Sequence, residues 1–547
     1  MINLLKKIDI GFLLYFGTLI YAIFFATRFF ETNDDMLMML IASGLFTGEP
    51  SEYIVFQNIV VGLFLKQLYL ISPDIHWYMV FLTLVQSLAF SAIYFLTLPF
   101  LNKLTRTALF VLPLLYFLFE FNIYLQFTKV AFLSSTVGIL YIIKYMSEQK
   151  NTYLFYSFVF LLLGFLIREH ALYGTFLTAL PVLIFFYFKY RPSIKINIKH
   201  ISFILLLIVI TFFSKTYDNT YYLNNSNNEW KNYKELIMTR GAIYRDRSIT
   251  KECFETNAKE FGLTHNDIAS YYKWTNDSNE IYTVKMISHV TQKCAKQTSE
   301  KYEKIFHVNY WKNFFMKLQS FSSVFILLLS FYLIFLFEKK YRYLLVLYTL
   351  FFISILMYLF TTAFDNRVVS SLLLEYYILL IFSYMHVKTQ QINVKTPVIV
   401  LLIIIGLLIS YLYIFEKTID RKSSFPIEKE LSTLKGNYVI VAKSKNFFES
   451  LTLDTDFKTL FHDTKFYYIG WNLGSPDTAK ILDEKSSNFY ELLLNKPNVI
   501  LYTDTHRIPV IQTFIQEHYG KKVTFKNIKN NYYKLDSVED VKTPLIR

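Results

Sequence analysis

The chain has 547 residues, of which 54% are hydrophobic and 18% are charged, and its mean hydropathy is +0.32. Soluble domains usually carry about 25% charged residues, so this composition excludes an ordinary soluble protein. Only two cysteines are present, which excludes a disulfide-rich scaffold or a cysteine-based zinc module. The composition predicts a polytopic membrane protein, and the placement of the basic residues decides whether the net charge of +14 indicates a nucleic-acid partner.

Apolar segments long enough to cross a bilayer recur along residues 1–416. A helix needs about 20 apolar residues to cross a hydrocarbon core roughly 30 Å thick. In lipid only helices and closed barrels satisfy the backbone, and the segments lack the alternation of a barrel strand. We predict eleven helical spans, at residues 10–30, 76–100, 107–126, 127–146, 152–168, 171–190, 200–214, 314–337, 343–362, 367–386 and 397–416.

The positions of Lys and Arg predict the orientation, because basic loops face the cytoplasm. When Lys6 and Lys7 are placed in the cytoplasm, every cytoplasmic loop is basic, and the net charge reflects topology rather than a nucleic-acid partner. This arrangement requires that the polar-containing segment 53–71 lies in the interface. We therefore expect interfacial helices within 31–75, a cytoplasmic N-terminus and an outer C-terminus, in a bacterial cytoplasmic (inner) membrane.

A long polar loop, residues 215–313, falls on the outer side of the predicted topology. Loops of this length are usually functional or separately folded, and its sequence has helical character. It contains Cys253 and Cys294, which can pair in an oxidising compartment or remain as two thiols. The helical stretches are 229–240, 250–261 and 278–305.

The tail, residues 417–547, differs in composition from the rest of the chain and is also expected on the outer side. Strand-like runs alternate with amphipathic helical runs, a pattern that predicts a small α/β domain. The strand-like runs are 438–442, 466–471, 499–502 and 522–534, and the helical runs are 477–494 and 508–519.

Ionisable side chains gather at the predicted outer ends of the spans. Such residues are costly at membrane level and are therefore functional candidates, although charged anchors at loop ends are the simpler alternative. Because they come from four separate turns, we expect them to line one outer cavity. The set comprises Asp34 and Asp35; Lys129; Arg168, Glu169 and His170; and Asp365 and Arg367.

The adjacent carboxylates Asp34 and Asp35 repel each other, so one of them should have a raised pKa unless a cation or metal lies nearby. One carboxylate can deprotonate an acceptor hydroxyl while the other orients it, and both are predicted to be catalytic. Arg168 suits bidentate recognition of phosphate. The remaining members of the set are predicted to bind substrate: Lys129, Glu169, His170, Asp365 and Arg367. A divalent metal is an alternative, but the spacing indicates no particular metal geometry, so no metal or other cofactor is expected.

The stretch Asn33–Gly48, followed by Pro50, Asn58, Gly62 and Trp77-Tyr78, resembles the first-loop region of the GT-C superfamily of integral-membrane glycosyltransferases. That group includes protein mannosyltransferases, the aminoarabinose transferases of lipid A and oligosaccharyltransferases. The resemblance implies that Asp34 is the catalytic or acceptor-binding carboxylate, with Asp35 as its neighbour. Metal-dependent members carry an acidic motif in the second outer loop. The corresponding turn here, 126–129, has no acid, which implies the metal-independent branch.

We therefore expect transfer of a sugar from a polyprenyl-phosphate donor to a lipid or glycan acceptor at the outer membrane face. Lys129, Arg168 and Arg367 would hold the phosphate. A polysaccharide polymerase or ligase is one alternative. A lipid-linked glycan transporter or flippase is another, although transporters use broken helices and polar residues near mid-membrane, whereas the polar residues here concentrate at the outer ends of the spans. No nucleic-acid partner is expected.

Overall fold

The computed structural model describes most of the N-terminal three quarters of the chain and most of the tail. Of the predicted spans, 314–337 lies outside the described residues, and only residues 408 and 415 of span 397–416 lie within them. The described residues are 10–97, 112–190, 198–224, 229–245, 251–273, 275, 281–296, 339–362, 365–387, 408, 415, 434, 436–442, 448, 451–462, 465–471, 475–482, 486–529 and 531–541.

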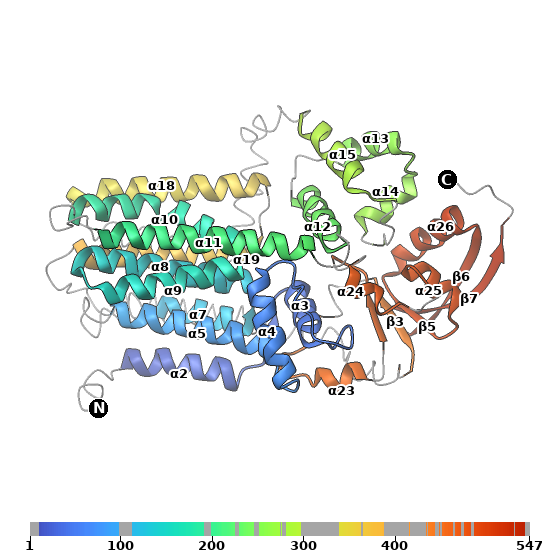
Figure 1. Cartoon of the computed structure of the whole chain (residues 1–547), viewed down its shortest axis with the longest axis horizontal. Helices are drawn as coiled ribbons and strands as arrows, with labels where there is room; N and C mark the ends of the chain where they lie inside the picture. Colours follow the sequence, from blue (N-terminus) through green and yellow to red (C-terminus); the bar gives the residue numbers. More distant parts are fainter. Residues whose placement is uncertain are drawn as a thin grey trace.

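Long helices lie side by side in a bundle that forms one half of the molecule (Figure 1). Six described helices are long and apolar enough to cross a membrane, which indicates a multi-pass membrane protein. They are α5 (Trp77–Thr97), α8 (Phe127–Glu148), α10 (Glu169–Tyr190), α11 (Ile198–Asn224), α18 (Lys339–Thr362) and α19 (Asn366–Val387).

Three further helices run along the bundle but are shorter. They are α2 (Ile10–Phe24), α7 (Leu112–Ile123) and α9 (Asn151–Ile167), with 15, 12 and 17 residues. Their described lengths fall below the ~20 residues that a straight span requires, so the predicted number of eleven spans stays a prediction.

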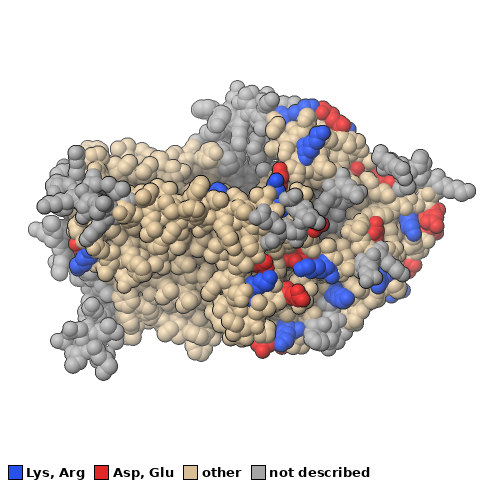
Figure 2. All heavy atoms as spheres, viewed as in Figure 1, with Lys and Arg blue, Asp and Glu red and all other residues tan. Residues whose placement is uncertain are grey.

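The outer surface of the bundle is apolar. Phe212 and Phe213 on α11 are 65% and 64% exposed. Figure 2 shows charged side chains gathered mainly over the other half of the molecule, while the visible bundle surface is largely uncharged. An apolar surface of this extent suits contact with lipid rather than with water.

Helix α8 lies inside the bundle and packs against α5, α9, α10 and α19. The packing against α9 requires a glycine, because a Cβ at Gly164 would lie 2.1 Å from the hydroxyl oxygen of Ser135. Small residues allow such close helix contacts in membranes. This contact holds the end of α9, and with it Arg168, against the first turns of α8.

Two helices, α3 (Asn33–Ser43) and α4 (Ile59–Ile71), lie across the end of the bundle (Figure 1). Helix α3 ends at Gly44, whose φ of 79° belongs to the left-handed region and whose Cβ would clash with the nitrogen of Pro50 at 2.6 Å. Helix α4 starts at Asn58, whose side chain accepts a hydrogen bond from the N–H of Val60. The transverse orientation is the one predicted for segment 53–71, and its depth in a bilayer stays a prediction.

A short parallel pairing ties the first outer segment to the end of α7. Strand β1 (Phe29–Phe30) pairs with β2 (Tyr124–Leu125), and the N–H of Glu31 donates to the carbonyl of Leu125 at 3.0 Å. The pairing brings the chain before α3 next to the start of α8, although the two segments are distant in sequence.

The long loop is helical, as predicted, and α11 extends further into it than predicted. The predicted span ended at residue 214, whereas α11 continues to Asn224 and carries polar residues in its last turns. Helix α14 was not predicted; a capping box between Thr264 and Asp267 starts it. The structure pairs Cys253 with Cys294 as a disulfide. The helices are α12 (Glu229–Arg245), α13 (Lys251–Ala258), η2 (Lys259–Phe261), α14 (His265–Tyr272) and α15 (Val284–Lys296).

The tail forms a mixed sheet with the strand order β4-β3-β5-β7-β6, and the predicted α/β character is confirmed. Strands β3 (Tyr438–Val441), β4 (Lys465–Tyr468) and β5 (Val499–Tyr502) are parallel, and β7 (Tyr532–Asp540) continues the sheet antiparallel to β5. The predicted strand 522–534 is in fact a hairpin of β6 (Lys521–Lys529) and β7. The remaining tail helices are α23 (Phe457–His462), α24 (Pro476–Ala479), α25 (Phe489–Asn495), η6 (Thr505–Arg507) and α26 (Ile508–Tyr519), so two short helices replace the single predicted helix 477–494.

We predict that loss of the disulfide destabilises the α12–α15 region. The two cysteines are 41 positions apart, and the chain-entropy model assigns about 4 kcal/mol to closing a loop of that length. Cys253→Ser should therefore increase cleavage of this region in limited proteolysis of the full-length protein. The double variant with Cys294→Ser should be no worse than either single variant. Two thiols that react with maleimide in the unreduced protein would contradict the pairing.

Candidate functional site

Most of the candidate residues predicted from the sequence lie at the end of the bundle that α3 and α4 cross. They fall into two groups. The acid-pair cluster surrounds the start of α3, and the charged pocket lies between the start of α4 and helices α10, α11 and α12. The acid-pair cluster comprises Glu31, Asp34, Asp35, Glu120, Lys129, Asp365 and Arg367.

Asp35 is completely buried and accepts three hydrogen bonds. One carboxylate oxygen accepts from the hydroxyl of Tyr78 and from the N–H of Phe127, both at 3.0 Å, and the other accepts from the hydroxyl of Thr32 at 2.9 Å. Burial raises the pKa of Asp35 to about 7, and the charge of Asp34 adds to the rise. The expected raised pKa is present, but burial rather than the neighbouring acid is its main cause. Asp35 therefore joins α3, α5 and α8, and its carboxylate is not exposed to solvent.

Asp34, by contrast, faces outwards with 29% of its side chain exposed. Its carboxylate lies 3.5 Å from the guanidinium of Arg367 at the start of α19, and the same guanidinium lies 3.4 Å from the carboxylate of Asp365. The structure therefore brings together three of the predicted residues from the first and last described parts of the bundle. An accessible carboxylate held by an arginine is suited to accept a proton from a hydroxyl group.

Lys129 is fully buried in the first turn of α8. Its ammonium lies 2.6 Å from the carboxylate of Glu31 and 2.5 Å from that of Glu120. Two carboxylates more than neutralise the one ammonium, so Lys129 fits the role of a structural cation better than the predicted role of a phosphate ligand. Glu120 lies within α7 and was not singled out from the sequence.

The charged pocket has a volume of about 400 Å³ and contains the predicted residues Arg168, Glu169 and His170. The guanidinium of Arg168 donates to the carbonyl of Phe56 at 3.1 Å and lies 5.4 Å from the ring centre of Phe127. Its backbone caps α9, which directs the side chain toward the start of α8. Stacked and hydrogen-bonded in this way, Arg168 is held in one orientation.

Helices α11 and α12 supply charges to this pocket that sequence reasoning missed. Lys215 pairs with Glu169 at 3.0 Å, and Lys234 pairs with Asp218 at 2.5 Å. Lys231 also lines the pocket, so its described lining includes four cations and three carboxylates. The spacing of Lys231, Lys234, Glu235 and Met238 on one helical face was a usable signal.

A short chain of contacts joins the two groups. The side-chain amide of Gln57, which lines the charged pocket, donates to the hydroxyl of Tyr78 at 3.2 Å, and Tyr78 donates to Asp35. The N–H of Phe127 donates to Asp35, and the ring of Phe127 contacts the guanidinium of Arg168. The orientation of α3, and therefore of Asp34, is thus coupled to the wall of the charged pocket.

Among the described residues, one group has the geometry to hold a metal ion, and it lies away from both of these groups. Ligand atoms of Asp267, Glu517 and His518 lie within 4.8 Å of one another. In the structure they have protein partners: the Nε2 atom of His518 is 2.7 Å from Asp267, and the hydroxyl of Thr264 donates to Glu517 at 3.1 Å. These contacts fasten α14 to α26.

We predict that Asp35 makes stability depend on pH in the direction opposite to that of an ordinary salt-bridged carboxylate. With its pKa raised from 3.8 to about 7, the folded protein keeps a proton that the unfolded chain loses. The free energy of unfolding should therefore fall as pH rises from about 4 to about 7, by at most about 4 kcal/mol, and level off above. Melting temperatures of the detergent-solubilised protein across this range measure the effect.

Asp35→Asn is the matched variant for this measurement. An asparagine resembles the protonated acid and retains an acceptor for Tyr78 and Phe127, so the wild type should lose stability relative to the variant as pH rises. Asp35→Ala leaves three donors without an acceptor and should cost about 3 kcal/mol or more at any pH. A wild type and an Asn variant with parallel pH profiles would contradict the buried, protonated state.

We further predict that Lys129→Met severely destabilises the protein, because it leaves Glu31 and Glu120 buried without a cation. Loss of one partner from a buried ion pair costs about 3–5 kcal/mol. Addition of Glu31→Gln and Glu120→Gln should restore most of the melting temperature. If the triple variant is no more stable than Lys129→Met, the uncompensated charges of Glu31 and Glu120 are not the cause of the destabilisation.

In comparisons with family models, with curated proteins and with solved structures, the chain matched none of them. The geometry of the two groups therefore carries the functional argument.

Proposed function

We propose that the protein is a membrane glycosyltransferase of the GT-C type. It would move a sugar from a polyprenyl-phosphate donor to a lipid or glycan acceptor at the outer face of the membrane. The observation that carries the proposal is the division of the acid pair: Asp35 is buried as a structural group, and Asp34 is exposed beside Arg367. The division supplies one accessible carboxylate on a helix that crosses the end of an apolar bundle.

The arrangement of charge supports the proposed outer location of this end. The opposite end of the bundle holds the basic side chains Lys144, Lys150 and Lys189 at helix termini, where basic residues are expected on the cytoplasmic side. The α12–α15 helices and the C-terminal sheet lie together beyond the end with α3 and α4 (Figure 1). Lipid-linked sugars suit this location because nucleotide sugars are confined to the cytoplasm.

In the proposed reaction the bond between the sugar C1 and the phosphate oxygen of the donor breaks, and a bond forms between C1 and the acceptor oxygen. Asp34 takes the proton of the acceptor hydroxyl, and Arg367, 3.5 Å away, orients that carboxylate. The leaving group is polyprenyl phosphate, whose charge would be stabilised by Arg168 with Lys215 and Lys231 at the charged pocket. Lys129 acts as a positioning residue through Glu31 rather than as a phosphate ligand.

Replacement of Asp34 tests the proposal. In membranes supplied in turn with radiolabelled polyprenyl-phosphate hexoses and pentoses, Asp34→Asn should lower the rate of transfer at least 100-fold, the lower limit of general-base effects. Asp34→Glu should retain part of the activity because the carboxylate is kept.

Asp74→Asn is the matched control, since Asp74 is an exposed acid whose carboxylate pairs with Lys458 at 2.6 Å. It should transfer sugar at the wild-type rate. A normal transfer rate in Asp34→Asn, at wild-type expression, would rule out Asp34 as the general base. Movement of a labelled lipid-linked glycan between leaflets without any transfer would favour a flippase.

A further inference from the structure

Two faces of helix α12 line two different cavities. Lys231, Lys234 and Glu235 line the charged pocket, whereas Asn232, Tyr233 and Leu236 line a second cavity on the other side. Each set includes residues that are three and four positions apart, as expected for one face of a helix. One helix therefore separates two cavities with different lining chemistry.

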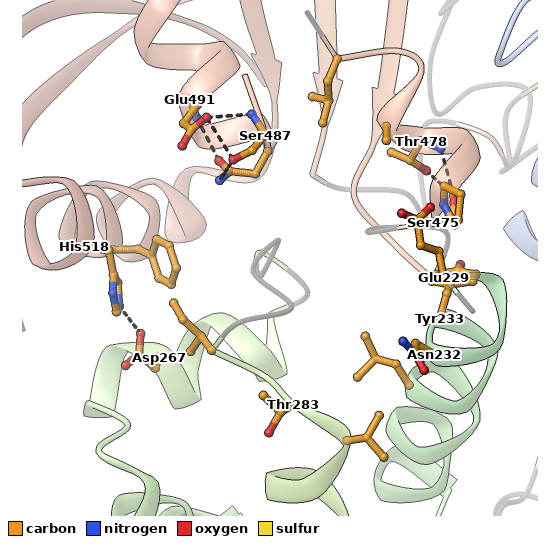
Figure 3. A pocket seen from close by; sticks show the side chains of 18 of the residues that line it. Glu229, Asn232, Tyr233, Asp267, Thr283, Ser475, Thr478, Ser487, Glu491 and His518 are labelled. Carbon is orange, nitrogen blue, oxygen red and sulfur yellow. Dashed lines mark hydrogen bonds and ion pairs between the residues drawn. The ribbon is translucent and has the colours of Figure 1, made fainter. Parts of the chain in front are cut away.

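The second cavity, here called the outer cleft, lies between helices α12, α14 and α15 on one side and the helices of the C-terminal sheet on the other. Its volume is about 1080 Å³, at the upper end of the ~300–1,000 Å³ typical of ligand pockets. Figure 3 shows Asn232 and Thr283 on one wall and Ser487, Glu491 and His518 on the other, around the same space.

The described lining of the outer cleft contains no Lys or Arg, in contrast to the four cations of the charged pocket. Among the described residues, a phosphate or other anion would therefore find no Lys or Arg partner in the cleft. Two of its three carboxylates already accept hydrogen bonds from the protein. Asp267 accepts from Thr264 and contacts His518, and Glu491 accepts from the N–H and the hydroxyl of Ser487. These contacts hold the two carboxylates in place, and carboxylate oxygens are also acceptors for the hydroxyl groups of a sugar.

The other polar groups of the described lining are amides and hydroxyls beside aromatic rings, and several of them, such as Ser475 and Asn488, also bond to protein groups. Side-chain amides and hydroxyls both donate and accept, which matches the hydroxyl groups of a sugar. Phe261, which is 40% exposed, and Tyr519 contribute ring surface, against which the C–H faces of sugar rings can pack. The lining thus favours an uncharged, polyhydroxylated ligand.

We propose that the outer cleft binds a neutral oligosaccharide. Binding there does not depend on the transferase proposal. The further step, that the bound glycan is the acceptor whose end reaches Asp34, rests on the proposed function.

The test uses the purified full-length protein in nanodiscs, labelled with a fluorophore and applied to an array of neutral and acidic oligosaccharides. We expect binding to neutral members, confirmed by titration of the free oligosaccharide. Asn232→Trp should weaken binding strongly by placing a bulky ring in the wall of the cleft, and Asn232→Ala should weaken it about 3- to 10-fold by removing one amide. Thr239→Ala, on α12 but outside the described linings of both cavities, should bind as the wild type does.

Three results would overturn the proposal: binding confined to acidic glycans, no binding to any neutral member, or neutral binding that survives Asn232→Trp in a protein with unchanged melting temperature. Preferential binding of a lysine-rich peptide in competition would identify the cleft as a peptide site instead. Addition of EDTA should leave the affinity for the glycan unchanged, because Asp267 and His518 are hydrogen-bonded to each other. A loss of affinity would indicate that these two side chains bind a metal ion.

The proposal of transferase activity and the proposal of glycan binding in the outer cleft can be contradicted independently. Asp34→Asn should bind glycan normally while losing transfer. If glycan binds the wild type and no donor supports transfer, the cleft stands and the transferase proposal falls. If transfer depends on Asp34 and is unaffected by Asn232→Trp, the acceptor does not occupy the cleft.

Discussion

The arrangement of the candidate site depends on one buried carboxyl group. Asp35 collects hydrogen bonds from Thr32, Tyr78 and Phe127, and so ties the transverse helix α3 to two helices of the bundle. The bonds fix the rotation of α3 about its axis, and a fixed rotation places the adjacent Asp34 on the outer side. A pair of acids that looks redundant in the sequence therefore has two separate roles, one in folding and one at the surface.

Charge at this end of the molecule is graded by burial. Lys129 is enclosed by two carboxylates, and Arg367 is shared between Asp34 and Asp365 at longer distance. In the charged pocket, Lys215 pairs with one carboxylate while half exposed. Lys129, the fully buried cation, is thus fully neutralised by two carboxylates, because a buried unpaired charge is costly. This pairing favours a structural role for Lys129.

Apolar runs in the sequence were sufficient to predict the described helices along the bundle and the strands β3 and β5, because burial sets them. The transverse segment 53–71 was predicted instead from its polar residues and from the placement of the basic loops. It could not predict pairings across the fold. Arg367 meets Asp34 from more than three hundred positions away, and Glu120 reaches Lys129 only because β1 and β2 align their segments. The length of α11 also escaped prediction, because the helix continues past the predicted end at residue 214 to Asn224 although its last turns are polar.

The C-terminal region is part of the site's framework rather than an appendage. The hydroxyl of Ser51, in the loop between α3 and α4, donates to Asp477 at 2.5 Å, and the hydroxyl of Tyr233 on α12 donates to the carbonyl of Trp471 at 2.5 Å. The ring of Trp471 also lies 4.8 Å from that of Phe56, which lines the charged pocket. Because buried polar contacts of this kind are lost if either partner moves, the tail and the transverse helices hold α12 in place from two sides. Both cavities that share α12 are therefore formed before any ligand arrives, which lowers the entropic cost of binding.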